Sequence, residues 1–426
     1  MEPDGRTAGA ERVVGLGTIA REWGRIGITG FGGPPAHILL LRRLCVERRR
    51  WLTPEEFEDG IAATNLLPGP ASTQLAVLTA WRLRGAPGAL VGGVCFIGPG
   101  LVLILALAAL FLAGDPPLWV LGAAAGAGAA VPAVAVQAAT TLVPAGLGRM
   151  GRTRAARVRW AGYALAGAVA AVLTGPWLVL VLIAAGLAEI AVRSDRSVPG
   201  VPSAPSDRGS REDPESPEDP EAPENRGGGG SGGRAVLPLA TGPLALGGLG
   251  VLGAVAWVAF KVGALSYGGG FVIIPLMRDD AVNRYHWMTD GQFLNAVALG
   301  QVTPGPVVHT VAAVGYAAAG LGGGLLAAAV AFAPSFLFVL LGGRYFDRLR
   351  ADRRVQDFLT GAGPAVTGAI AGSVLPLAAS LGYGWQWGVL AGALLWLVLA
   401  RRGVVPALLA AGAAGVLAVA AGLPPA

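Results

Sequence analysis

The chain has 426 residues, of which 54% are hydrophobic and only 14% are charged, and its mean hydropathy is +0.59. Soluble domains carry about 25% charged residues, so this composition excludes an ordinary soluble protein and predicts an integral membrane protein. The net charge of +6 does not indicate a nucleic-acid partner, because the arginines cluster in short segments between apolar runs and report membrane orientation. We expect a multi-pass protein of the cytoplasmic membrane, in contact with lipid.

The cysteines and the N-terminus point to no further chemistry. Cys45 and Cys95 are the two cysteines, and they have no histidine or cysteine neighbour at ligand spacing. They therefore predict neither a disulfide framework nor a metal site, and no cofactor motif is visible. The N-terminal residues lack the apolar core of a signal peptide.

The first half of the chain holds six apolar segments, at roughly 13–41, 61–82, 88–113, 118–145, 160–173 and 176–192. The second segment contains Pro68-Gly69-Pro70, which should break a helix because proline removes a backbone donor and clashes with the preceding turn. Broken backbone at membrane depth is tolerated only inside protein or beside a wet cavity. Between the first two segments, Trp51-Leu52-Thr53-Pro54-Glu55-Glu56-Phe57 predicts an interfacial tryptophan followed by an N-capped amphipathic anchor helix.

Residues 193–235 contain seven prolines, a glycine-rich tract and more acidic than basic residues. This composition predicts a disordered linker. Six further apolar segments follow at roughly 244–277, 292–319, 321–342, 361–381, 385–400 and 404–423, the second of which contains Pro304-Gly305-Pro306. We therefore divide the chain into a first transmembrane repeat at 1–192, the linker at 193–235 and a second transmembrane repeat at 236–426.

The two halves carry the same motifs at a constant spacing of 236 residues. The first copy runs Arg25-x-Gly27, Phe31-Gly32-Gly33, Trp51-Leu52-Thr53, Phe57 and Asn65-Leu66-Leu67-Pro68-Gly69-Pro70. The second copy runs Lys261-x-Gly263, Tyr267-Gly268-Gly269, Trp287-Met288-Thr289, Phe293 and Gln301-Val302-Thr303-Pro304-Gly305-Pro306. An internal duplication in an apolar chain is typical of a transporter built from two structural repeats.

The arginine distribution predicts that the repeats have opposite orientations. The loops after the first and fourth segments are basic in the first half, whereas those after the third and fifth are basic in the second half. By the positive-inside rule, equivalent loops then lie on opposite sides of the membrane and the linker is cytosolic. We expect an all-α polytopic membrane protein with two inverted-topology repeats. Each repeat has about five spanning helices plus one broken or re-entrant segment.

The two breaks are the expected substrate site. Transporters with inverted repeats bind substrate near the midplane, where half-helix N-termini point inward, and such termini favour anions. Arg25 and Lys261, the only lysine in the chain, would add positive charge. The substrate-binding candidates are Arg25, Phe31, Gly32, Gly33, Asn65, Pro68, Gly69, Pro70, Ser72, Thr73, Gln74, Lys261, Tyr267, Gly268, Gly269, Gln301, Pro304, Gly305, Pro306, His309 and Thr310. The alternative for Ser72 and Thr73 is simple capping of a helix end.

A proton-coupled carrier needs a titratable group at depth. His309 is the first candidate, ahead of His37 and Glu189. No carboxylate stands clearly in the middle of a long apolar segment, and Asp279-Asp280 is interpreted as a pair in a loop. This pattern favours an anion over a cation as the substrate.

These motifs resemble those of the chromate ion transporter (CHR) family. Both Asn/Gln-x-x-Pro-Gly-Pro elements, the Phe/Tyr-Gly-Gly elements and Lys261-Val262-Gly263 are similar to its signature, in the long two-domain form. The resemblance implies efflux of chromate, driven by the membrane potential or a proton gradient, and chromate resistance. Arg25 stands in place of the family's lysine in the first half, and His309 stands where the first half has Thr73.

Other functions are weighed against chromate export. A transporter or exchanger of sulfate or another tetrahedral oxyanion fits the same residues, because the two dianions share charge and nearly share size. An intramembrane enzyme, such as a chromate reductase or a lipid transferase, would need a nucleotide fold, an acidic metal motif or a nucleophile–base pair, none of which is visible. A structural or regulatory membrane protein does not explain the polar breaks. A second copy of the chain, in a homodimer, is a candidate partner.

Overall fold

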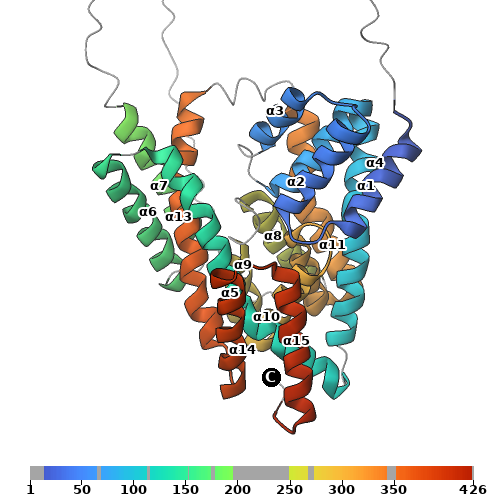
Figure 1. Ribbon diagram of the computed structural model, residues 1–426, viewed down its shortest axis with the longest axis vertical. Coiled ribbons are helices and arrows are strands. Elements are labelled where there is room, and N and C mark those ends of the chain that lie inside the picture. The colour runs from blue at the N-terminus through green and yellow to red at the C-terminus, as the bar shows by residue number, and fades with distance from the viewer. Residues whose placement is uncertain are drawn as a thin grey trace, which may run out of the picture.

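The computed structural model describes eight stretches of the chain: residues 14–64, 69–112, 116–151, 153–173, 178–194, 249–266, 273–342 and 352–424. Within these stretches every regular element is a helix (Figure 1). Four helices are long and apolar enough to cross a membrane: Ala71–Phe111, Leu118–Met150, Val307–Gly342 and Arg353–Ala379. The chain is an all-α polytopic membrane protein, as its composition predicts.

In the described part of the first half there are eight helices. They are α1 (Leu16–Thr29), α2 (Pro34–Arg42), the π-helix η1 (Arg43–Arg48), α3 (Pro54–Thr64), α4 (Ala71–Phe111), α5 (Leu118–Met150), α6 (Arg154–Leu173) and α7 (Leu178–Ser194). The second half is built from α8 (Leu249–Leu265), α9 (Ile273–Arg278), the π-helix η3 (Asp279–Arg284), α10 (Asp290–Val302), the 3-10 turn η4 (Val307–His309), α11 (Thr310–Gly342), α13 (Arg353–Ala379), α14 (Gly384–Leu394), the π-helix η5 (Leu395–Leu399) and α15 (Val404–Ala420).

The first apolar segment, at 13–41, is not one helix. It divides into α1 and α2 between Gly30 and Gly33. Gly32 and Gly33 have φ of +97° and +74°, a region that side chains rarely enter. The two prolines that follow supply no N–H to the preceding turn, so helix α2 has to start afresh there.

Helix α4 is a hairpin rather than a rod. Its backbone leaves helical geometry at Arg84 and Gly85, and a Cβ added at Gly92 would lie 2.5 Å from the Cβ of Ala80. In a straight helix these residues would be about 18 Å apart. Helix α11 turns back in the same way at Ala319 and Gly320. The first arm of α4 ends before Arg84 and is about 20 Å long, so it spans only part of a hydrocarbon core of about 30 Å.

That the segment after each break is re-entrant remains a prediction. The predicted breaks are confirmed where the structure describes them: Gly69–Pro70 precedes α4, and Thr303–Pro306 separates α10 from η4. The N-capped helix after Trp51 is also confirmed. Thr53 and Glu56 exchange hydrogen bonds between side chain and backbone N–H, as a capping box requires. Trp51 itself stacks on Trp23, with ring centroids 6.3 Å apart.

Backbone features recur at the 236-residue spacing of the motifs. The π-helices η1 and η3 occupy equivalent positions, and each is followed by a left-handed residue, Arg50 (φ 49°) or His286 (φ 53°). Thr289 and Gln292 form the equivalent of the Thr53 capping box. Helices α5 and α13, which run in opposite directions in Figure 1, carry prolines twelve residues apart, at Pro132 and Pro144 and at Pro364 and Pro376. The opposite orientation of whole repeats remains a prediction.

One long helix of each half packs against helices of the other half. Helix α13 of the second half packs against α6 and α7 of the first, and α5 of the first half packs against α14 and α15 of the second (Figure 1). Glycines make these contacts close: a Cβ added at Gly122 would lie 2.7 Å from the carbonyl oxygen of Gly415. Gly167 and Gly368 abut the carbonyl oxygens of Ala365 and Ala164 in the same reciprocal way. Such close approach through small residues is the main source of helix association in lipid.

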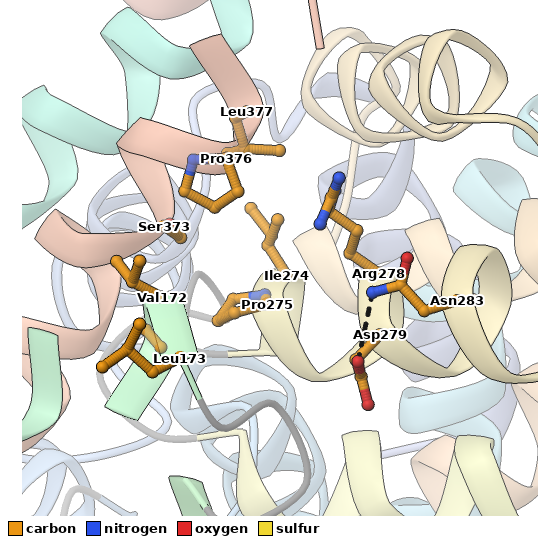
Figure 2. Close-up of a pocket in the computed structure, with 11 residues that line it drawn as sticks. Val172, Leu173, Ile274, Pro275, Arg278, Asp279, Asn283, Ser373, Pro376 and Leu377 are labelled. Carbon is orange, nitrogen blue, oxygen red and sulfur yellow. Dashed lines mark hydrogen bonds between the residues drawn. The ribbon is translucent and has the colours of Figure 1, made fainter. Parts of the chain in front are cut away.

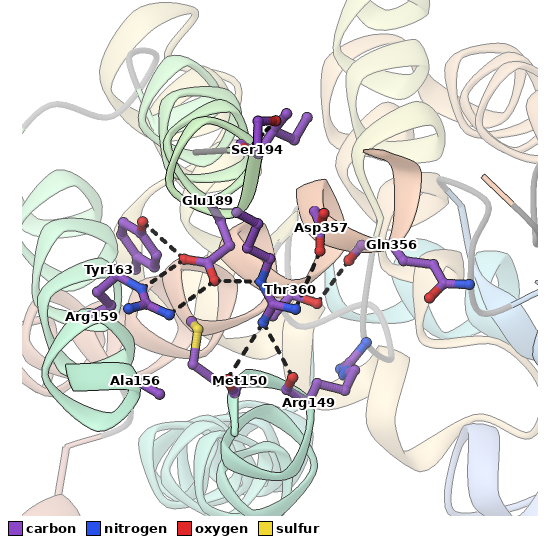
Figure 3. Close-up of polar contacts among 12 residues, drawn as sticks. Arg149, Met150, Ala156, Arg159, Tyr163, Glu189, Ser194, Gln356, Asp357 and Thr360 are labelled. Carbon is purple, nitrogen blue, oxygen red and sulfur yellow. Dashed lines mark hydrogen bonds and ion pairs between the residues drawn. The ribbon is translucent and has the colours of Figure 1, made fainter. Parts of the chain in front are cut away.

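An ion-pair cluster joins the halves at one end of these helices (Figure 3). The fully buried carboxylate of Glu189 on α7 accepts hydrogen bonds from Arg159 (3.1 Å), Tyr163 (3.2 Å) and Arg193 (2.7 Å). Arg193 also lies 3.3 Å from Asp357 on α13. Glu189 was a secondary candidate for proton coupling, and the structure places it between two guanidinium groups, where a carboxylate stabilises the packing of α6, α7 and α13.

Candidate functional site

The Pro-Gly-Pro break of each half contacts the break that follows the first helix of the other half. The N–H of Gly69 donates to the carbonyl of Ser266 (2.8 Å), directly after α8. The N–H of Gly305 donates to the carbonyl of Gly30 (3.0 Å), directly after α1. Both donors and both acceptors are 236 positions apart, so the two contacts are equivalent. Gly69 and Gly305 have φ of +125° and +99°, a conformation that favours glycine at these positions.

Each break is followed by a helix start with unpaired backbone donors. In α4 the N–H groups of Thr73 and Gln74 return to the carbonyl of Pro70. In η4 the N–H of His309 returns to the carbonyl of Pro306. Helix geometry leaves the residues before them, Ala71 with Ser72 and Val307 with Val308, without an intrahelical acceptor. Two pairs of N–H groups, one pair from each half, are therefore available to a ligand.

A cavity of about 400 Å³ adjoins these helix starts. Its lining consists of Gly32, Gly33, Pro34, Pro35, Ile38, Ala71, Val134, Gln137, Ala138, Thr141, Leu142, Gln301, Val307 and Val404. None of these described lining residues carries a charge. Helices α2, α4 and η4 all begin at the cavity, so three positive helix ends face a neutral space with an amide or hydroxyl group on Gln137, Thr141 and Gln301. At about 30 Å³ for each water, the cavity holds a small ion together with several waters.

The described site residues other than Arg25 and Lys261 fall into three groups. Gly32, Gly33 and Gln301 line the cavity, with Phe31 beside them and 45% exposed. Gly69, Pro70, Pro304, Gly305 and Pro306 form the breaks themselves. Five others lie behind the helix starts and are buried, namely Ser72, Thr73, Gln74, His309 and Thr310. Asn65, Pro68, Tyr267, Gly268 and Gly269, the linker beyond Ser194 and the loops at 113–115, 174–177 and 343–351 lie outside the described residues.

The two predicted cations are not brought to the cavity. Arg25 is exposed on α1. Lys261 on α8 forms an ion pair with Asp280, which is buried, and lies over the ring of Trp257 at 5.8 Å. The interpretation of Asp279-Asp280 as a loop pair is wrong, because both residues belong to the π-helix η3. The continued helix carries Asp280 back towards α8, where the carboxylate neutralises the ammonium.

We expect Lys261→Met to destabilise the protein by about 3–5 kcal/mol, because it leaves the buried Asp280 carboxylate unpaired. The double variant Lys261→Met with Asp280→Leu removes both charges and should recover most of that loss. Thermal unfolding of the purified protein in detergent measures both effects. Arg25→Met, at the exposed equivalent position, is the control and should change the stability by less than about 0.5 kcal/mol. A double variant no more stable than Lys261→Met would contradict a structural ion pair.

Two buried histidines flank the contact between Gly30 and Gly305. Nε2 of His37 donates to the Gly30 carbonyl (2.9 Å), the same oxygen that accepts from Gly305, and the ring meets the edge of Phe96 at 5.1 Å. His309 meets Phe332 at 5.3 Å, and neither of its ring nitrogens has a hydrogen-bond partner among the described residues.

The chain is similar to proteins of one family along most of its length. The family model described as chromate transporter matches residues 17–190 and 253–418, one stretch in each half. The chain belongs to the chromate transporter family. Chromate transport proteins of Cupriavidus metallidurans and Pseudomonas aeruginosa are each 30% identical to it, over 83% of this chain and 80% and 79% of their own lengths. A probable chromate transport protein of Synechococcus elongatus is 28% identical over 83% of the chain and 82% of its own length. No solved structure matches the chain.

This member of the chromate transporter family has a second cavity, of about 270 Å³, two of whose lining helices, α9 and α13, are equivalent to α2 and α5 of the first (Figure 2). Ile274 on α9 lines it where Ile38 on α2 lines the first, and Ser373 on α13 stands where Thr141 stands on α5. Charged groups lie on one side of this cavity. Arg278 pairs with Asp290 (2.6 Å), and Asn283 donates to Asp279 (3.2 Å). Residues of both halves line each of the two cavities.

Sequence reasoning missed several polar residues of this site. Gln137 and Thr141 are four residues apart on one face of α5, a spacing visible in the sequence among apolar neighbours. Ser266 and Ser335 carry no motif, and only the contacts of Gly69 with both reveal them. Serine in an apolar helix usually bonds to its own backbone, so sequence gives little reason to select these two.

Proposed function

We propose that this protein exports chromate across the cytoplasmic membrane, with the oxyanion bound between the two Pro-Gly-Pro breaks. The observation that carries the proposal is the pair of helix starts at the first cavity, with N–H groups of Ala71, Ser72, Val307 and Val308 supplied equally by both halves. Backbone donors at helix N-termini bind tetrahedral oxyanions without a charged side chain. The relatives named chromate transport proteins supply the identity of the ion.

The neutral lining suits a carrier, which has to release its substrate, better than a site that holds the ion tightly. A fixed arginine or lysine in the cavity would hold a dianion through a strong ion pair and slow its release, whereas helix ends contribute only about half a charge each. Moving a dianion out of a compartment whose interior is negative releases about 4.6 kcal/mol per 100 mV, since each charge contributes about 2.3 kcal/mol. The membrane potential therefore supports export. Proton coupling through His309 would add to this driving force.

The other predicted site residues have expected roles that follow from their positions. The aromatic-Gly-Gly element at Phe31, Gly32 and Gly33 and the amide of Gln301 would contact the ion's outer oxygens. The glycines and prolines of the breaks shape the backbone that presents the N–H groups. Arg25 stands apart from the cavity, where its charge would act only on approaching ions.

Chromate flux into inside-out membrane vesicles tests the proposal. Vesicles carrying the full chain should accumulate radiolabelled chromate when energised, and an uncoupler should abolish the accumulation. Vesicles with Val307→Asp, which places a carboxylate at the cavity, serve as the inactive control. No energised chromate accumulation would overturn the proposal. Accumulation of sulfate alone, with chromate neither transported nor competing, would assign the site to sulfate.

A further inference from the structure

Three fully buried hydroxyl groups near the first break have no hydrogen-bond partner in the described part of the chain. Thr73 on α4, Ser266 after α8 and Ser335 on α11 are each at most 1% exposed, and none of their hydroxyl oxygens is hydrogen-bonded among the described residues. Buried hydroxyls are otherwise satisfied here: Thr79, one turn and a half further along α4, donates to the carbonyls of Leu75 (2.8 Å) and Ala76 (3.1 Å). Unpaired buried polar groups are rare in folded proteins and call for a ligand.

Two of the three residues contact Gly69, and the third follows it by four positions. The Ser266 carbonyl accepts the N–H of Gly69, and Oγ of Ser335 lies 3.4 Å from the position that a Cβ on Gly69 would take. Thr73 lies in the first turn of the helix that Gly69 and Pro70 introduce. The group therefore combines one residue of the first half with two of the second, at a left-handed glycine where the backbone is not helical.

The end of helix α8 contributes negative potential at this group, opposite in sign to the contribution from the start of α4. Helix α8 ends at Leu265, so its unpaired carbonyls and the negative end of its dipole lie next to Ser266. The one basic side chain on α8, Lys261, is already paired with Asp280. Hydroxyl oxygens are neutral acceptors of the kind that hard metal cations prefer. Without a carboxylate among the three, the site would not repay the cost of dehydrating a divalent ion, so a monovalent ion fits.

The equivalent position in the other half is filled by a group that can become a cation. His309 stands 236 positions after Thr73, and Gly30 stands 236 before Ser266. Gly100 corresponds to Ser335 when the helix prolines Pro99 and Pro334 are matched. A Cβ added at Gly100 would lie 2.7 Å from Cε1 of His309, so this imidazole occupies the space beside Gly100, whereas the ring of His37 fills the space beside Gly30. One half has a histidine side chain where the other half has three hydroxyl groups without a hydrogen-bond partner among the described residues.

We propose that Thr73, Ser266 and Ser335 bind a sodium ion beside the oxyanion cavity. This inference rests on the proposed function, because the ion's role is to offset one charge of the dianion held two residues away at Ala71 and Ser72. Binding of the two ions is then coupled, so that sodium raises the affinity for chromate and chromate raises the affinity for sodium by the same factor. A factor of about 5–150 is typical of such coupling.

The test uses the purified full chain and two measurements. Thermal unfolding in NaCl, KCl and choline chloride at equal ionic strength reports ion binding, because a ligand that binds only the folded state raises Tm. Chromate affinity in the same salts reports coupling. We expect a rise in Tm and at least a fivefold gain in chromate affinity in sodium alone, both lost in Thr73→Val and in Ser335→Ala. Each variant is compared with itself across salts, so a lower baseline stability does not affect the result.

Thr79→Val is the matched control, since it removes a buried hydroxyl of the same helix that is already hydrogen-bonded. It should keep the full sodium response. Equal responses to all three salts, or a sodium response that survives in both Thr73→Val and Ser335→Ala, would overturn the sodium site. Chromate flux that does not depend on sodium would overturn the sodium site and leave chromate export standing. Absence of chromate flux in every salt would instead overturn the proposed function.

Discussion

Replacing Ala71 by aspartate is expected to abolish oxyanion transport while the protein still folds. Ala71 is the first residue of α4 and lines the cavity. A carboxylate in the first turn of a helix is stabilising, by about 0.3–1 kcal/mol, because it interacts with the positive helix end. The same carboxylate would take the place of the transported anion. At an effective dielectric constant of about 20, two unit charges about 4 Å apart repel by about 4 kcal/mol, and a dianion doubles that value.

Chromate binding to Ala71→Asp should therefore be weaker by at least about a thousandfold, and flux into vesicles should fall to background. Ala71→Asn, of nearly the same shape and without the charge, is the matched control and should keep measurable transport. Size-exclusion chromatography and Tm of both variants establish that they are folded. Normal chromate flux through Ala71→Asp would show that the anion does not pass the start of α4. Equal loss in both variants would show that size rather than charge matters at this position.

Replacing Gly167 by valine should prevent the two halves from assembling. Gly167 of α6 abuts the carbonyl oxygen of Ala365 on α13, and Gly368 of α13 abuts that of Ala164. A side chain at Gly167 meets backbone, which cannot rotate away as a flexible side chain can. The helices have to separate, which also removes the reciprocal contact at Gly368. Overpacking of this kind costs about 1–3 kcal/mol in a soluble core, and loss of a whole small-residue interface costs more.

Gly162→Val provides a control on the same helix, because a Cβ at Gly162 has no neighbouring atom within 4 Å. Both substitutions lower the intrinsic flexibility of α6 to the same degree, so only the contact differs. The yield of monodisperse protein after detergent extraction should fall sharply for Gly167→Val and stay at the level of the original chain for Gly162→Val. Similar yields for both would mean that α6 and α13 do not pack through these glycines in the membrane.

The sequence predicts the parts of this fold that depend on local chemistry. Pro-Gly-Pro breaks a helix wherever it stands, and Thr53 with Glu56 forms a capping box from neighbouring residues alone. The repeated motifs predict the two halves, and the family comparison matches a stretch in each. The break at Gly30–Gly33 can also be predicted from the sequence, because two glycines followed directly by two prolines rarely continue a helix.

The contacts between the halves could not be predicted in this way. The pairing of Lys261 with Asp280 depends on a π-helix, whose extra residue per turn redirects the side chain and leaves no clear mark in composition. The packing of α5 and α13 against the opposite half depends on which of many similar glycine faces meet, and the sequence contains many such faces. The cavity depends on both, so the sequence predicts its helix starts but not Gln137 or Thr141 on its far side.

The packing of long helices across the two halves has a consequence for biosynthesis. Helices α6 and α7 leave the ribosome long before α13, the helix against which they pack, has been translated. Until then, Glu189 can form its ion pairs with the two arginines of the first half, but Arg193 cannot pair with Asp357. The glycine face of α6 is covered only by lipid or by the insertion machinery. The first half therefore stays an incompletely packed intermediate until α13 has been made, and it is not an independent folding unit. Degradation of chains stalled before residue 353 should accordingly be much faster than that of the finished protein.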